Sequence, residues 1–267
     1  MWVTLKRILI TGSGRGLGRA SAIALSKRGQ LVYATTYTKE QAESLNKFAK
    51  NKKLSLKAFK LDILSPKDRA LVNDLKIDVL INNAAIGDSG SVCEIDVDRY
   101  RKTFETNVFS NIELTQMVLK NMIDRGSGRV IFISSLLGRI TLPFLSPYTS
   151  TKFAIEAIAT SLKKELKQLN NAKIDVAIIE PGAYHTGFNQ ENVSKQFKWM
   201  KYKSYFKDKI RLLKFKQYGY FKLIELKSLN SIVKQYINAV EDKHLKDRYV
   251  APFYQGTYFQ LKRIIGK

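Results

Sequence analysis

The sequence contains one group of side chains suited to acid–base chemistry, namely Ser135, Tyr148 and Lys152. Near the start of a helix, residues four apart share one face, so the Lys152 ammonium can lie close to the Tyr148 phenol. A nearby cation favours the phenolate and lowers the pKa of a tyrosine from its usual value of about 10. A phenol adjusted in this way can donate a proton to a carbonyl or accept one from an alcohol.

Tyrosine followed by lysine at this spacing is not diagnostic by itself. The same pattern recurs at Tyr205/Lys209, Tyr218/Lys222 and Tyr258/Lys262. Context selects Tyr148, because Ser135 lies thirteen residues before it at the end of an apolar run, "FISSLLG". Ligands of open α/β sheets bind outside the carboxyl ends of the strands, which is where we expect Ser135. The adjacent Ser134 is the rival for this role, and the spacing favours Ser135.

A glycine-rich stretch, "TGSGRGLG", follows the first apolar run and precedes a helical pattern. Such a turn can hold a phosphate, because glycine permits close backbone approach and the helix end supplies free N–H groups. The stretch does not match the pattern G-x-G-x-x-G, since Leu17 or Arg19 stands where the third glycine belongs. The alternative interpretation is an ordinary glycine-rich turn between a strand and a helix.

The elements that must position these residues form an alternating pattern. Apolar runs, interpreted as strands, occupy residues 7–11, 31–35, 54–61, 79–81, 130–133 and 174–179, and helical patterns occupy 16–28, 39–50, 66–75, 97–124 and 147–169. A further helix is expected at 228–241 and a short strand at 248–252. This alternation predicts an α/β fold with one doubly wound, Rossmann-type parallel sheet of about seven strands and helices on both faces. We expect a single domain over residues 1–267.

The pattern changes after residue 182, where a basic and aromatic segment begins. Residues 195–227 contain eleven Lys or Arg, two acids and nine aromatic residues. We expect residues 183–227 to form a small helical lid over the substrate. Aromatic side chains there would provide a wall for a bulky apolar substrate, whereas the simpler interpretation is a basic amphipathic lid packed on the core.

Taken in order, the motifs resemble those of the short-chain dehydrogenase/reductase family from about residue 5 to 186. They are T-G-x-x-x-G-x-G, "LINNAA", "ETNVFS", Ser135, the Y-x-x-x-K at Tyr148 and a P-G pair, with a loose likeness to the hydroxysteroid and retinol dehydrogenase branch. The resemblance implies a catalytic set of Asn107, Ser135, Tyr148 and Lys152. Tyr148 would be the general acid/base, Lys152 would lower its pKa and Ser135 would bind the substrate oxygen. Asn107 would fix a distortion of its helix and a water that relays protons.

The same resemblance implies an enzyme that interconverts a carbonyl and an alcohol with a nicotinamide cofactor. The implied cofactor-binding residues are Gly12, Ser13, Arg15, Gly16, Leu17, Gly18, Asp62, Ile63, Asn83, Ala84, Tyr148, Lys152, Pro181, Gly182 and Thr186. An NAD site places an acid after the second strand, where this chain has Thr36, Tyr37 and Thr38. Arg15 stands where NADP-dependent relatives often carry a cation. We therefore expect NADP(H) rather than NAD(H).

The composition is strongly basic, with 46 Lys and Arg against 23 Asp and Glu, a net charge of +23 and a pI near 9.9. Such a chain attracts anions in general, so a nucleic-acid binder or a membrane-surface binder stays open as an alternative, as does a non-catalytic NADP(H)-sensing protein. The two histidines form no metal set. A single cysteine and the lack of a long apolar stretch favour a cytoplasmic protein. The resemblance implies a homodimer or homotetramer that acts on a small molecule, without nucleic acid but with peripheral membrane contact left open.

Overall fold

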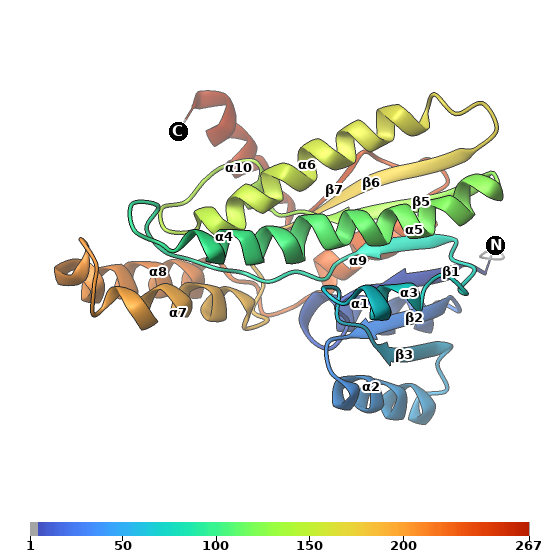
Figure 1. The fold of residues 1–267 in the computed structure, drawn as a ribbon, viewed down its shortest axis with the longest axis horizontal. Coiled ribbons are helices and arrows are strands. Elements are labelled where there is room, and N and C mark those ends of the chain that lie inside the picture. The colour runs from blue at the N-terminus through green and yellow to red at the C-terminus, as the bar shows by residue number, and fades with distance from the viewer. Residues whose placement is uncertain (1–4, 267) are drawn as a thin grey trace.

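The chain folds around one seven-stranded parallel sheet in a computed structural model that describes residues 5–266 (Figure 1). The strand order is β3-β2-β1-β4-β5-β6-β7. The strands are β1 (Arg7–Ile10), β2 (Leu31–Thr36), β3 (Leu56–Lys60), β4 (Val79–Asn82), β5 (Ser127–Ile133), β6 (Lys173–Pro181) and β7 (Arg248–Ala251). Residues 1–4 and 267, the two ends of the predicted domain, lie outside the described residues. The order reverses at β1 and β4, which creates the crevice where doubly wound sheets bind ligands.

Helices cover both faces of this sheet, as Figure 1 shows. They are α1 (Gly16–Lys27), α2 (Lys39–Asn51), α3 (Pro66–Ala70), α4 (Val97–Phe104), α5 (Ser110–Asp124), α6 (Ser146–Leu166), α7 (Phe188–Met200), α8 (Ile210–Ile224), α9 (Asn230–Glu241) and α10 (Phe253–Ile265). In β1, Ile8 and Ile10 pack with residues of α1, α2 and α9, whereas Leu9 packs with residues of α5 and α6. Burial on both faces explains the near-continuous apolar runs, and the predicted fold class is confirmed.

Some predicted boundaries were wrong. The helix expected at 66–75 ends at Ala70. The chain continues in tight turns, one of which is closed by the hydrogen bond from the Val72 N–H to the Arg69 carbonyl. The helix expected at 97–124 is interrupted by a π-helical turn, Glu105–Phe109, which contains Asn107, the residue at which the family resemblance implies a distortion of this helix. There the Asn111 amide donates to the carbonyls of Thr106 and Asn107, a side-chain competition that hydrophobic periodicity does not reveal. Helix α10 was not assigned from the sequence.

The segment after residue 182 contains α7 and α8 and has a small apolar core of its own. Val193, Phe197 and Met200 of α7 pack there with Phe221 of α8 and with Leu145, which precedes α6. This cluster attaches the segment to the carboxyl end of the sheet, beside the start of α6. Within residues 5–266, no helix is long and apolar enough to cross a membrane.

Candidate active site

The structure brings Ser135, Tyr148 and Lys152 together at the carboxyl end of β5. Ser135 follows that strand and caps a short 3₁₀ turn, Leu136–Gly138, by accepting a hydrogen bond from the Leu137 N–H. Tyr148 lies in the first turn of α6, just after Pro147, whose fixed φ suits a helix start. Lys152 lies one turn later and is 4% exposed, and its Nζ donates to the Ile133 carbonyl at 2.7 Å.

The burial of these groups shifts both ionisation equilibria. Burial raises the pKa of Tyr148 above its ordinary range, and the facing hydroxyl of Ser135 opposes this effect. Burial lowers the pKa of Lys152 to about 8, with Glu156 acting in the opposite direction. Burial therefore outweighs the expected lowering of the Tyr148 pKa. Lys152 Nζ lies 5.5 Å from the centroid of the Tyr148 ring, and it donates its hydrogen bond to the backbone.

The other three tyrosine–lysine pairs occupy different surroundings. Tyr148 is 8% exposed, whereas Tyr205 is 83% and Tyr258 is 52% exposed. Tyr218, the remaining one, lies on α8 and is also classed as exposed. Burial beside a serine and a lysine thus distinguishes Tyr148 from the rest.

Asn107 lies within the π-helical turn and connects two parts of the site. Its Oδ1 accepts from the Ile86 N–H and its Nδ2 donates to the Ile86 carbonyl, both at 2.8 Å. The same Nδ2 also donates to Thr151 Oγ1 of α6 at 3.1 Å. Asn107 therefore fixes the loop after β4 against the helix that carries Tyr148.

The glycine-rich turn after β1 has the geometry of a cradle for a diphosphate. Gly12 and Gly16 have φ angles of +68° and +59°, which side chains rarely tolerate. A Cβ on Gly18 would lie 2.5 Å from the Gly12 carbonyl oxygen. No side chain caps the N-terminus of α1 and no acidic residue stands in its first turn. The free N–H groups and the positive helix end fit a bound anion such as the diphosphate of a dinucleotide.

The side chains of Thr11, which is buried, and Asn83, which is partly buried, hold this turn in place. Thr11 Oγ1 accepts from the N–H groups of Asn83 and Ala84, each at 2.9 Å. The Asn83 amide donates to the carbonyls of Thr11 and Gly12, and its Oδ1 accepts from the Tyr236 hydroxyl of α9. The side chain of Asn83 thus supports the turn. Tyr236 was missed by the sequence analysis because it lies 153 residues from its partner and no local motif marks it.

The two residues directly after β2, Tyr37 and Thr38, are not carboxylates. Thr38 caps α2 in a reciprocal capping box with Gln41, and Tyr37 is exposed. Arg15 forms an ion pair with Glu191 of α7. Both side chains are about half exposed, at 64% and 48%. Glu191 was not identified from the sequence, since only the fold brings α7 to the glycine-rich turn.

The remaining predicted cofactor residues follow the ends of their strands. Asp62 and Ile63 come after β3, where the Ile63 carbonyl already accepts from Arg69. Pro181 ends β6 and Gly182 lies against Gln255, which accepts from the Ala183 N–H. Thr186 is near the turn after β1, as a Cβ on Gly16 would lie 3.5 Å from its Cβ. Ser13 and Leu17 belong to the turn and to the start of α1.

The first residue of α7 covers the catalytic tyrosine. The ring of Phe188 packs edge-on against that of Tyr148, with centroids 5.5 Å apart. One turn later, Asn192 lies against Gly87 of the loop after β4. Beyond it, a cavity of about 530 Å³ lies between α4, α7 and this loop, lined by residues that include Ile86, Arg99 and Lys195. Helix α7 therefore covers the Tyr148 ring with Phe188 and lines this cavity with residues further along the helix.

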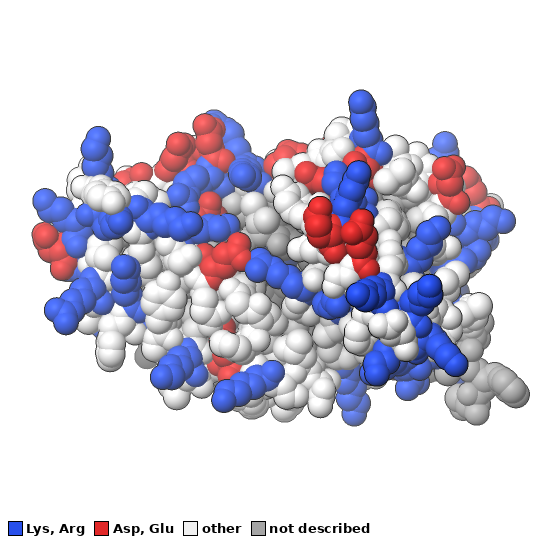
Figure 2. All heavy atoms as spheres, turned by 90° about the horizontal axis from the view of Figure 1, so that it is seen from below, with Lys and Arg blue, Asp and Glu red and all other residues white. Residues whose placement is uncertain are grey.

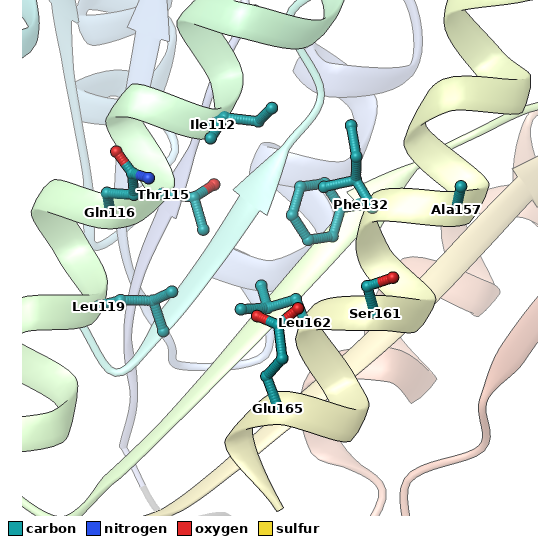
Figure 3. Close-up of a pocket in the computed structure, with 10 residues that line it drawn as sticks. Ile112, Thr115, Gln116, Leu119, Phe132, Ala157, Ser161, Leu162 and Glu165 are labelled. Atoms are coloured by element: carbon teal, nitrogen blue, oxygen red, sulfur yellow. The ribbon is translucent and has the colours of Figure 1, made fainter.

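A second cavity, of about 330 Å³, lies between α5 and α6 and is also lined by Phe132 of β5 (Figure 3). Ile112 and Leu119 line it from α5, and Leu162 and Glu165 line it from α6. These α6 residues lie more than three turns beyond Tyr148, so this hollow is separate from the candidate site. Among residues 5–266, no group of His, Cys, Asp or Glu side chains could hold a metal ion.

A doubly wound parallel sheet with a glycine-rich turn after its first strand defines the class of Rossmann-type proteins. The chain belongs to the short-chain dehydrogenase/reductase family, because the family model for short chain dehydrogenases matches residues 6–196. It is 34% identical over 196 residues to the uncharacterized oxidoreductase YusZ of Bacillus subtilis, a match that covers 71% of this chain and 69% of that protein.

Two solved structures show the same fold. A short chain dehydrogenase/reductase from Burkholderia phymatum, in complex with NAD, has a TM-score of 0.82 at 15% identity and covers 99% of this chain and 95% of its own. A short-chain dehydrogenase from Sphingobium yanoikuyae, in complex with NADPH, has a TM-score of 0.75 at 20% identity. The match covers 98% of this chain and 94% of that protein. Family membership favours an oxidoreductase over the nucleic-acid binder considered above.

Proposed function

We propose that the protein is an oxidoreductase that interconverts a carbonyl and an alcohol by hydride transfer with NADP(H) and acts on an apolar substrate. The observation that carries this proposal is the burial of Tyr148 and Lys152 beside Ser135, at the carboxyl end of a sheet whose first turn fits a diphosphate. Two proteins of the same fold are known in complex with NAD and with NADPH, which supports a nicotinamide cofactor.

The chain's own residues would bind, orient and protonate the substrate. The nicotinamide, when bound, supplies or accepts the hydride. Tyr148 donates the proton to the carbonyl oxygen, and Ser135 donates a hydrogen bond to the same oxygen as negative charge develops there. Lys152, mostly charged at neutral pH with its pKa near 8, stabilises the phenolate that remains. Asn107 is a positioning residue, because it acts through Ile86 and Thr151.

The direct test is Tyr148→Phe, with Tyr258→Phe as the matched control. The first change removes the proton donor and should abolish turnover in a screen of steroids, retinal, quinones, 3-oxoacyl thioesters and simple ketones, while NADPH fluorescence still reports binding. The control, on an exposed tyrosine of α10, should retain activity. Turnover by Tyr148→Phe at the wild-type rate would refute the proposed mechanism.

Preference for NADP(H) is proposed to depend on Arg15, because the residues directly after β2, Tyr37 and Thr38, are not carboxylates and Arg15 is the cation of the glycine-rich turn. A 2′-phosphate would compete with Glu191 for the guanidinium. Arg15→Ala should weaken NADPH binding about tenfold and leave NADH nearly unchanged. Because exposed ion pairs contribute at most about 1 kcal/mol, Glu191→Gln should strengthen NADPH binding by no more than about fivefold. Equal effects of Arg15→Ala on both cofactors, measured by fluorescence titration, would exclude this assignment.

We also propose that residues 183–227 act as the substrate lid, because Phe188 of α7 lies directly on the Tyr148 ring. The single domain and the cytoplasmic location stay predictions, as does the homodimer or homotetramer.

A further inference from the structure

Helix α8 has apolar side chains on two opposite faces. Its inner face carries Ile210 and Phe221, which are buried in the small core formed with α7. Its outer face carries Leu212, Phe215 and Leu223, which are 50%, 78% and 85% exposed. These three positions share one side of the helix, because their spacing follows its period of about 3.6 residues. Packing within the chain explains the apolar side chains of the inner face, whereas those of the outer face are exposed to solvent.

Helix α10 also carries exposed apolar side chains. The Gln255 amide donates to the Ile224 carbonyl at 2.8 Å, which joins the start of α10 to the end of α8. The outward side chains of α10 are also apolar or aromatic. The α8/α10 surface comprises Leu212, Phe215, Leu223, Phe253, Tyr254, Tyr258, Leu261, Ile264 and Ile265, all at least half exposed. Large exposed apolar side chains gathered on two adjoining helices indicate an interaction site.

The same region is strongly cationic. The segment from residue 201 to 222 carries Lys201, Lys203, Lys207, Lys209, Arg211, Lys214, Lys216 and Lys222 and only one acid, Asp208. On α8, Lys216 and Lys222 are exposed beside the apolar stripe. Figure 2 shows Lys and Arg standing among uncharged side chains at the end of the molecule formed by α7 and α8. Eight cations cannot be neutralised by one carboxylate of the same segment.

We propose that the α8/α10 surface binds the surface of an anionic lipid bilayer, with its apolar side chains inserted at the level of the headgroups. Apolar side chains bordered by lysines are the combination that such an interface favours, because insertion buries the first and the negative leaflet attracts the second. A second copy of the chain fits less well, since a two-fold interface would place like charges against each other. A nucleic acid would satisfy the lysines but would leave Leu212 and Leu223 in water.

The test is co-sedimentation of the full chain with phosphatidylcholine vesicles, with and without phosphatidylserine. Phe215→Ser combined with Leu223→Ser should reduce binding to the anionic vesicles about tenfold or more. Lys216→Glu combined with Lys222→Glu should reduce it by about fivefold or more per residue. The matched controls are Leu71→Ser with Val97→Ser, which are exposed apolar residues elsewhere, and Lys47→Glu with Lys50→Glu on α2. Both control pairs should bind as the wild type does.

Three results would overturn the proposal. The first is equal binding to neutral and anionic vesicles, or none to either. The second is an equal loss of binding in the control pairs, which would show that overall charge alone is responsible. The third is a dimer in analytical ultracentrifugation that dissociates in the Phe215→Ser, Leu223→Ser variant, without vesicle binding by the wild type. Because every substituted side chain is exposed, circular dichroism should show each variant folded, and the NADPH titration then reports separately on the proposed function.

Discussion

Replacing Lys152 with methionine should reveal what the burial of this charge costs the fold. Methionine keeps an unbranched side chain one atom shorter and removes the ammonium of Lys152, a residue that is 4% exposed in the native protein. Burial lowers the pKa of Lys152 from 10.5 to about 8, so the unfolded chain holds this proton more tightly than the folded chain does. The stability of the wild type therefore rises with pH between these two values, whereas that of Lys152→Met lacks this contribution.

The magnitude follows from the two pKa values. At about pH 7 the lowered pKa costs the wild type roughly 3 kcal/mol, and at about pH 9.5 it costs roughly 1 kcal/mol, so the wild type gains about 2 kcal/mol relative to the variant over this range. The variant also loses the hydrogen bond from Nζ to the Ile133 carbonyl, which lowers its stability. Below the native pKa this loss does not depend on pH, so the wild type still gains stability over the variant as pH rises.

The measurement is urea unfolding of both proteins at the two pH values, with circular dichroism as the signal. Other titrating groups are shared by the two chains and cancel in the difference. A difference in the free energy of unfolding that stays constant with pH, or that moves in the variant's favour as pH rises, would show that Lys152 is not a desolvated cation. The variant should also lose turnover under the proposed mechanism. Because the burial cost at neutral pH is larger than the contribution of one hydrogen bond, its free energy of unfolding should rise while its activity falls.

Two further substitutions test the support of the site. Gly18→Ala would place a Cβ 2.5 Å from the Gly12 carbonyl oxygen, so the turn must shift, and NADPH binding measured by fluorescence should weaken about tenfold or more in a folded protein. Unchanged binding would contradict the cradle geometry. Arg139→Met removes one partner of the fully buried Glu180, leaving Arg248 as the other. It should lower the free energy of unfolding by about 3 kcal/mol in urea denaturation, whereas a neutral effect would show that Arg248 alone compensates the charge.

Much of the architecture could be predicted from the sequence, because parallel strands buried on both faces appear in it as short, nearly continuous apolar runs. The runs at β1, β4 and β5 are almost wholly apolar, and the four glycines between residues 12 and 18 fix the turn after β1. The structure also places Ser135 at the end of β5, and Tyr148 and Lys152 one turn apart at the start of α6, so their spacing in the sequence corresponds to proximity in the fold.

What only the tertiary structure decided concerns contacts between distant segments. The Arg15–Glu191 ion pair, the Phe188 ring on Tyr148 and the Tyr236 hydroxyl on Asn83 join residues between 40 and 176 positions apart. No local pattern encodes such contacts, because they depend on how helices pack on the finished sheet. The ionisation of Tyr148 is decided at the same level. The local spacing predicted a lowered pKa, and burial, a property of the whole fold, raises it instead.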